Sequence, residues 1–132
     1  MSMDDNDRNE VIKLQAERAQ NIIKEIDILI ENRLWATTAN RLYYALFHAA
    51  CALLIKDEHA VKSHQGVNMA LGQFYVKNGM LTPNDGKFYG RMQGLREKSD
   101  YNCMIQITED EVKSLVEPTK ELVGKLLLLA AS

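Results

Sequence analysis

Residues 40–52 read Asn-Arg-Leu-Tyr-Tyr-Ala-Leu-Phe-His-Ala-Ala-Cys-Ala. The stretch has no Gly or Pro and is rich in Ala and Leu, so its composition favours a helix. At about 3.6 residues per turn, two of the three faces of that helix are apolar. A helix that is apolar nearly all round must be surrounded by protein, so we expect these residues to form the middle of a helical bundle.

The third face of this helix is polar. It carries Arg41, Tyr44, His48 and Cys51 at steps of three and four residues. A polar group that is buried without a partner costs about 1 to 3 kcal/mol. Either neighbouring helices or a ligand must therefore supply partners for these side chains.

The rest of the chain also has helical periodicity. Apolar residues recur at helical spacing over residues 4–32, 34–56, 63–78 and 83–99, and again from residue 108 onward. Ser63, Thr82 and Thr108 are candidate N-caps, and Pro118 predicts a kink in the last helix. We therefore predict an all-α protein, an antiparallel up-and-down bundle of four to five helices. One domain spans residues 1–132, with residues 1–8 frayed or disordered.

The helix expected over residues 83–99 is unusual. We expect it to bury Phe88, Met92 and Leu95, yet Gly86, Gly90 and Gly94 recur on one stripe. Each Gly costs about 1 kcal/mol relative to Ala inside a helix. Either a backbone or ligand approaches this stripe closely, or the helix is frayed and mobile.

Composition limits the classes of function. The chain has 132 residues and a net charge of -2, which argues against a protein that coats nucleic acid. Its first residues lack a signal peptide, and the longest apolar run, residues 126–131, is too short to cross a bilayer. Cys51 and Cys103 are predicted to be free thiols. We expect a soluble cytoplasmic protein without a membrane association.

Residues 56–98 are locally basic, with seven Lys and Arg against four Asp and Glu. The densest part interleaves Phe88 and Tyr89 with Lys87, Arg91, Arg96 and Lys98. Such a patch can hold phosphates and stack bases. Composition alone favours a solvated helix face over a binding patch.

Most catalytic motifs are absent. The sequence has no phosphate-binding Gly loop, nucleophile elbow or Ser/His/Asp set at a known spacing. His48 and Cys51 are three residues apart, but two ligands do not make a metal site, and we expect neither a metal nor a cofactor. Arg96 and Asp100 can meet on one helix face, either to tie the helix end or to leave Arg96 for a phosphate. We expect Arg41, Tyr44 and His48 to face that end.

Three motifs together resemble the HEPN family (higher eukaryotes and prokaryotes nucleotide-binding), in particular its small stand-alone prokaryotic proteins. They are Asn40 to Ala45 followed by Phe47 to Ala50, Lys62 to Gly66, and Leu95-Arg96 with Ser99 to Tyr101. The resemblance covers nearly the whole chain from about residue 10. It implies a single HEPN-like helical domain that works as a homodimer. Family members are often encoded beside a minimal nucleotidyltransferase, and some act in toxin and antitoxin pairs.

Many similar family members are metal-independent ribonucleases with the motif Arg-x(4-6)-His. Arg96 matches the Arg, but Tyr101, Asn102 and Cys103 stand where the His is expected. Neither Tyr nor Asn titrates near neutral pH, so the motif lacks its acid or base. The resemblance therefore leaves enzymatic activity open.

Three hypotheses follow. The first is a HEPN-type module that works as a homodimer and binds a nucleotide, RNA or a co-encoded minimal nucleotidyltransferase. The second is a metal-independent ribonuclease in which Arg96 stabilises the phosphate and His48 or His64 carries the proton. The third is a purely structural bundle. The ligand-binding candidates are Arg41, Tyr44, His48, Ser63, His64, Arg96, Asp100 and Tyr101.

Overall fold

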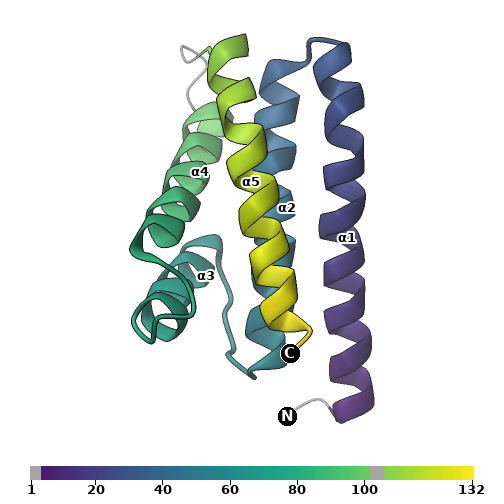
Figure 1. The fold of residues 1–132 in the computed structure, drawn as a ribbon, viewed down its shortest axis with the longest axis vertical. Coiled ribbons are helices and arrows are strands. Elements are labelled where there is room, and N and C mark those ends of the chain that lie inside the picture. Colours follow the sequence, from purple (N-terminus) through teal and green to yellow (C-terminus); the bar gives the residue numbers. More distant parts are fainter. Residues whose placement is uncertain (1–3, 102–105) are drawn as a thin grey trace.

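The computed structural model describes residues 4–101 and 106–132, without the side chains of residues 99–101. These residues form α1 (Asp5–Glu31), α2 (Trp35–Lys56), α3 (His64–Leu71), the π-helical turn η1 (Gly72–Val76), α4 (Pro83–Tyr101) and α5 (Glu109–Ala130). The described residues contain no strand, so the predicted all-α class is confirmed. The four long helices alternate in direction along the bundle (Figure 1).

Helix α2 lies at the centre of the bundle, as its sequence predicts. It packs against α1, α3, α4 and α5. Leu42, Ala45, Leu46, Ala49 and Leu53 are each at most 1% exposed. The small Ala side chains on this face allow neighbouring helices to approach α2 closely.

The predicted N-caps are confirmed at three helix starts. The Ser63 hydroxyl accepts a hydrogen bond from the Gly66 N–H at 2.9 Å, and the Thr108 hydroxyl accepts one from the Glu111 N–H at 3.2 Å. Thr82 accepts from the Asp85 N–H at 3.0 Å. Each cap satisfies a backbone donor that the helix itself leaves unpaired.

The first helix begins close to the start of the predicted stretch, residues 4–32. A carboxylate oxygen of Asp4 accepts a hydrogen bond from the Asp7 N–H at 2.8 Å, and α1 begins at Asp5. Arg8 contacts Asp5 at 2.7 Å and Glu58 at 2.9 Å. Residues 5–8 are therefore helical, and residues 1–3 lie outside the described part of the chain.

The register of α4 differs from the prediction. Tyr89, Met92 and Gln93 are buried, whereas Phe88 and Leu95 are only half-buried. The helix continues to Tyr101, two residues beyond the predicted end. The sequence of α4 has no dominant apolar stripe, so the face that packs on the core is set by its neighbours.

The Gly stripe of α4 has two environments. A Cβ at Gly86 would lie 3.1 Å from Val76 in η1, and one at Gly90 would lie 3.5 Å from the Asn68 amide in α3. A Cβ at Gly94 would meet nothing within 4 Å in the described part of the chain. The close neighbour at Gly86 is thus a side chain rather than the backbone or ligand that we expected, and Gly94 has no such neighbour among the described residues.

The bundle end where α1 turns into α2 carries Trp35, the only tryptophan in the sequence. Arg33 adopts a left-handed conformation (φ 58°) between the two helices. The ammonium of Lys113 in α5 lies 5.8 Å from the centre of the Trp35 ring. This cation–π contact connects the start of α2 to the start of α5.

None of the described helices is long and apolar enough to span a membrane.

Candidate functional site

Side chains from three helices meet beside α2 and form what we call the Arg96 cluster, made of Tyr43, Tyr44, His64 and Arg96. Helix α2 supplies both tyrosines, α3 supplies His64 as its first residue, and α4 supplies Arg96. The guanidinium carbon of Arg96 lies 5.3 Å from the Tyr43 ring centre and 5.9 Å from that of Tyr44. Such contacts are typical of cation–π attraction, in which a planar guanidinium packs against aromatic rings.

Arg96 also contacts the Tyr44 hydroxyl. One of its terminal nitrogens donates a hydrogen bond to that oxygen at 3.4 Å. The contact and the two ring faces hold the guanidinium at a half-buried position, where its charge is screened less than at the open surface. An arginine so placed can bind phosphate or carboxylate through its planar set of donors.

His64 is held by an aromatic cage. Its Nδ1 lies 2.7 Å from the Tyr43 hydroxyl oxygen. Its ring centre lies 4.3 Å from that of Phe47 and 5.9 Å from that of Tyr44. The N-cap at Ser63 fixes the start of α3 and so helps to place His64 in the cluster.

The charge of the cluster is concentrated on Arg96. Burial, and then the positive charge of Arg96, lowers the pKa of His64, so its imidazole is neutral at pH 7. Burial raises the pKa of Tyr43 to about 12, so its phenol stays protonated. The cluster thus presents one cation beside neutral groups that can form hydrogen bonds.

Arg41 and His48 lie in a different place. Together with Arg18, Asn21, Ile22 and Glu25, they line a groove of about 400 Å³ between α1 and α2. Arg41 contacts the Glu25 carboxylate at 3.9 Å, and Nδ1 of His48 lies 2.6 Å from the side-chain oxygen of Gln15. Burial, and then the charges of Arg18 and Arg41, lowers the pKa of His48.

The polar face of α2 therefore divides between two neighbours. Tyr44 faces Arg96, whereas Arg41 and His48 face α1, so the expectation that all three face the end of α4 holds for Tyr44 alone. The two parts still adjoin, because the rings of Tyr44 and His48 are 6.3 Å apart.

Other predicted site residues have separate outcomes. Ser63 acts as the N-cap of α3. The side chains of Asp100 and Tyr101 lie outside the described part of the chain. Sequence reasoning missed Tyr43, which it placed on the apolar face of α2. A tyrosine hydroxyl in a core usually needs a hydrogen-bonding partner, and that chemical requirement was the available signal.

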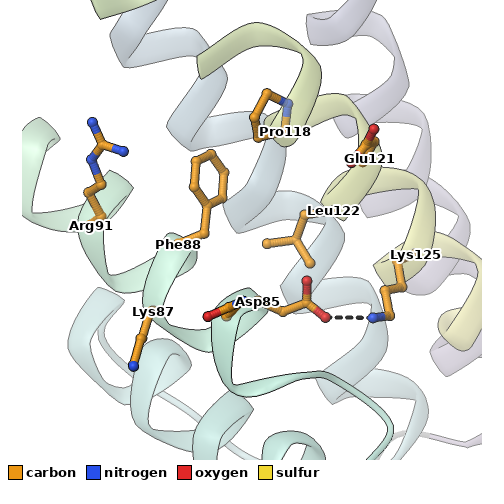
Figure 2. A pocket seen from close by; sticks show the side chains of 9 residues that line it. Asp85, Lys87, Phe88, Arg91, Pro118, Glu121, Leu122 and Lys125 are labelled. Atoms are coloured by element: carbon orange, nitrogen blue, oxygen red, sulfur yellow. Dashed lines mark hydrogen bonds and ion pairs between the residues drawn. The ribbon is translucent and has the colours of Figure 1, made fainter. Parts of the chain in front are cut away.

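The predicted basic patch on α4 is also divided. Tyr89 is fully buried and cannot stack on a ligand, and Arg96 points to α2. Lys87 and Arg91 instead line a groove of about 530 Å³ between α4 and α5, with Phe88 at its centre (Figure 2). Its other lining residues are Asn84, Asp85, Pro118, Glu121, Leu122 and Lys125.

One end of this groove is closed by an ion pair between Asp85 and Lys125 (Figure 2). Although burial of Asp85 acts to raise its pKa, hydrogen bonds from Lys125 and Thr82 outweigh burial and lower it. The groove therefore keeps a charged pair at one end and two exposed cations on its α4 rim.

The described residues contain no group of three His, Cys, Asp or Glu side chains placed to hold a metal ion. Cys51 is a free thiol, and burial raises its pKa to about 11. His48 is engaged by Gln15 rather than by Cys51. Cys103 lies outside the described residues.

Comparison with known proteins agrees with the sequence motifs. The family model described as the HEPN domain matches residues 12–128. A UPF0332 protein of Thermotoga maritima is 32% identical over 111 residues, 84% of this chain and 84% of that protein. A protein of Methanocaldococcus jannaschii named as a putative toxin is 32% identical over 120 residues, 91% of this chain and 89% of that protein.

A second Methanocaldococcus jannaschii protein, also named as a putative toxin, is 25% identical over 100 residues, 76% of this chain and 68% of its own length. The family match extends from α1 into α5, and so it includes every helix that contributes to the Arg96 cluster. The chain belongs to the HEPN family.

Proposed function

We propose that this protein is a HEPN-type binding module whose Arg96 cluster holds a phosphate group of a nucleotide or RNA. The observation that carries the proposal is the position of Arg96 against Tyr43 and Tyr44, with His64 on the same two rings. Arginine donors and a neutral imidazole suit a phosphate, and aromatic rings beside them suit a base. Because the chain carries a net charge of -2, a local site explains binding better than a general attraction to nucleic acid.

The proposal extends to a paired system. The family resemblance implies a homodimer that works with a co-encoded minimal nucleotidyltransferase. Two relatives carry names that describe them as putative toxins, which supports a toxin-antitoxin-like role. In such a pair, the Arg96 cluster would contact either the ligand or the partner protein.

Titration calorimetry with adenosine 5′-monophosphate and with a short single-stranded RNA tests the binding role. Arg96→Ala is expected to weaken binding about 10- to 100-fold, since hydrogen bonds to charged groups contribute about 1.5 to 3 kcal/mol. Arg91→Ala is the matched control, because it removes the same side chain from the same helix but at the α4–α5 groove. Affinity should also fall as salt is added. Equal losses from both variants, or no binding by the wild type, would contradict the proposal.

The paired role is tested separately. Sedimentation velocity of the purified chain should give the mass of a dimer, and a monomer at all concentrations would exclude the homodimer. Co-expression with the neighbouring reading frame should yield a stable complex if that frame encodes a small nucleotidyltransferase.

A metal-independent ribonuclease is the second candidate. The observation in its favour is that His64 and Arg96 contact the same Tyr43 ring. A histidine therefore lies near the arginine that matches the family motif, although residues 101–103 supply none. Purified protein should then cleave RNA in EDTA, and Arg96→Ala should abolish cleavage while the helical circular dichroism is kept. Failure to cleave any RNA would exclude this candidate.

A structural bundle is the third candidate. Arg41 and His48 already contact Glu25 and Gln15, so protein partners supply part of what the polar face needs. If Arg41→Ala and His48→Ala lower only the melting temperature, and Arg96→Ala changes no binding, this candidate is favoured.

A further inference from the structure

The hydrogen bond between Tyr43 and His64 determines which ring nitrogen of His64 carries the proton. The two atoms, the Tyr43 hydroxyl oxygen and Nδ1, are 2.7 Å apart. Either the phenol donates to an unprotonated Nδ1, or a protonated Nδ1 donates to the phenol. The two cases leave opposite chemistry at Nε2, the other ring nitrogen.

The surroundings of Tyr43 favour the first case. Its side chain is fully buried, and among the described residues Nδ1 of His64 is the acceptor within hydrogen-bonding distance of its hydroxyl. The neighbouring Tyr89 ring is 6.1 Å away. A contact between the two hydroxyls acts to raise the pKa of Tyr89 and to lower that of Tyr43, the directions expected when Tyr89 is the donor and Tyr43 the acceptor. Burying a hydroxyl proton without an acceptor is costly, so the Tyr43 hydroxyl proton is expected to point to Nδ1 of His64.

We infer that Tyr43 donates its hydroxyl hydrogen bond to Nδ1 of His64, and so positions the imidazole with its proton on Nε2 as a donor to phosphate. Tyr43 is then a positioning residue, whereas His64 and Arg96 contact the ligand. The second half of this inference rests on the proposed phosphate-binding function.

The charges around His64 support a neutral ring. Arg96 carries a full positive charge next to the same two tyrosines, and this charge disfavours a second proton on the imidazole. Glu97 acts in the opposite direction, but burial and Arg96 outweigh it. The hydrogen bond of His64 to Tyr43 uses Nδ1, which leaves Nε2 as the ring nitrogen that would donate to a ligand oxygen.

This tautomer separates the candidate functions. A general base must offer an unprotonated nitrogen to the substrate, but here Nδ1 is occupied by Tyr43 and Nε2 carries a proton. His64 can therefore donate to a phosphate oxygen but cannot abstract the 2′-hydroxyl proton of RNA in this state. Arg96 and Nε2 of His64 are then both donors, as a phosphate-binding site requires.

Nuclear magnetic resonance of the ligand-free protein tests the tautomer directly. Long-range proton–nitrogen correlations of uniformly nitrogen-15-labelled protein distinguish protonated from unprotonated ring nitrogens, and His64→Gln identifies the His64 signals among the three histidines. We expect Nε2 to be protonated and Nδ1 to be a hydrogen-bonded acceptor. A proton on Nδ1 in the wild type would overturn the inference.

Tyr43→Phe keeps the ring and removes only the hydroxyl. It should shift the Nδ1 resonance toward that of a ring nitrogen without a protein donor. Tyr44→Phe is the matched control, because its hydroxyl contacts Arg96 and not His64, and it should leave Nδ1 unchanged. An unchanged Nδ1 resonance in a folded Tyr43→Phe variant would overturn the inference. If that variant does not fold, the wild-type spectrum still decides.

Binding of adenosine 5′-monophosphate, measured on the same samples, separates this inference from the proposed function. If Tyr43→Phe populates both tautomers equally, half of the molecules are competent and the dissociation constant rises about twofold. The expected tautomer without ligand binding would refute the proposed function alone. Ligand binding with a proton on Nδ1 would refute the inference alone.

Discussion

Two histidines are kept neutral by their environments, and this has a consequence for stability. Burial is the main cause of the lowered pKa at both His48 and His64, with arginine charges as the second cause. The unfolded chain binds protons near the ordinary histidine pKa of 6.5, whereas the folded chain binds them only at lower pH. The unfolded state therefore holds more protons in this window, and folding stability rises with pH.

We predict that the free energy of unfolding falls as the pH is lowered from about 7, and that the contribution of the two histidines becomes level below their folded-state pKa values. Urea denaturation at a series of pH values measures this profile. The double variant His48→Gln/His64→Gln should flatten the profile over the same window. A wild-type profile that is already flat there would contradict the prediction.

A buried tyrosine on η1 gives a second prediction for a single residue. Tyr75 is 2% exposed, and its hydroxyl donates a hydrogen bond to the Asp57 carboxylate at 2.6 Å. Tyr75→Phe should lower the free energy of unfolding by about 1.5 to 3 kcal/mol, because the bond is to a charged group. A double-mutant cycle with Asp57→Ala isolates the pair, and additive losses would show that the bond contributes nothing.

Individual helices show how far local sequence determines structure. The N-caps at Ser63, Thr82 and Thr108 were predictable because a cap depends on residues within one turn. The buried register of α4 was not, since Tyr89 is chosen over Phe88 by packing against other helices. The π-helical turn η1 has no local sequence signal that helical periodicity alone detects.

The glycines of α4 give a prediction for an element. Gly94→Ala should raise the free energy of unfolding by about 0.5 to 1 kcal/mol, because Ala is the better helix former and a Cβ there has open space. Gly86→Ala is the matched comparison, and the 3.1 Å approach to Val76 should cancel part or all of that gain. Thermal unfolding of both variants measures the difference. Equal gains would show that Val76 moves without cost.

At the scale of the whole molecule, α2 supports every other helix. Leu46 is fully buried in α2, and Leu46→Ala should lower the free energy of unfolding by about 2 to 5 kcal/mol. Leu128 in α5 is 72% exposed, and Leu128→Ala should change the free energy of unfolding by less than about 0.5 kcal/mol. Chemical denaturation of the two variants checks both values. A small loss at Leu46 would mean that the bundle can close around the cavity.

The sequence predicted the bundle because the central helix is apolar on two faces, and it predicted a polar edge on the third face. It did not predict which helices contact which residues of that face, because the partners of Arg41 and His48 lie on a different helix, α1. Tyr44 and Arg96 are 52 residues apart in the sequence, and we predicted only that Tyr44 faces the end of α4 where Arg96 lies. Binding sites assembled from several helices depend on packing that no single helix encodes.

The cation–π contact between Trp35 and Lys113 offers an optical use of the fold. Because the sequence has one tryptophan, all tryptophan fluorescence comes from the end of the bundle where α2 and α5 begin. Circular dichroism, by contrast, follows every helix at once. If the two signals change together during denaturation, the bundle opens as one cooperative unit. If fluorescence changes first, unfolding begins at the end of the bundle where α2 and α5 start. The emission of Trp35 alone would then identify this end as the least stable part of the bundle.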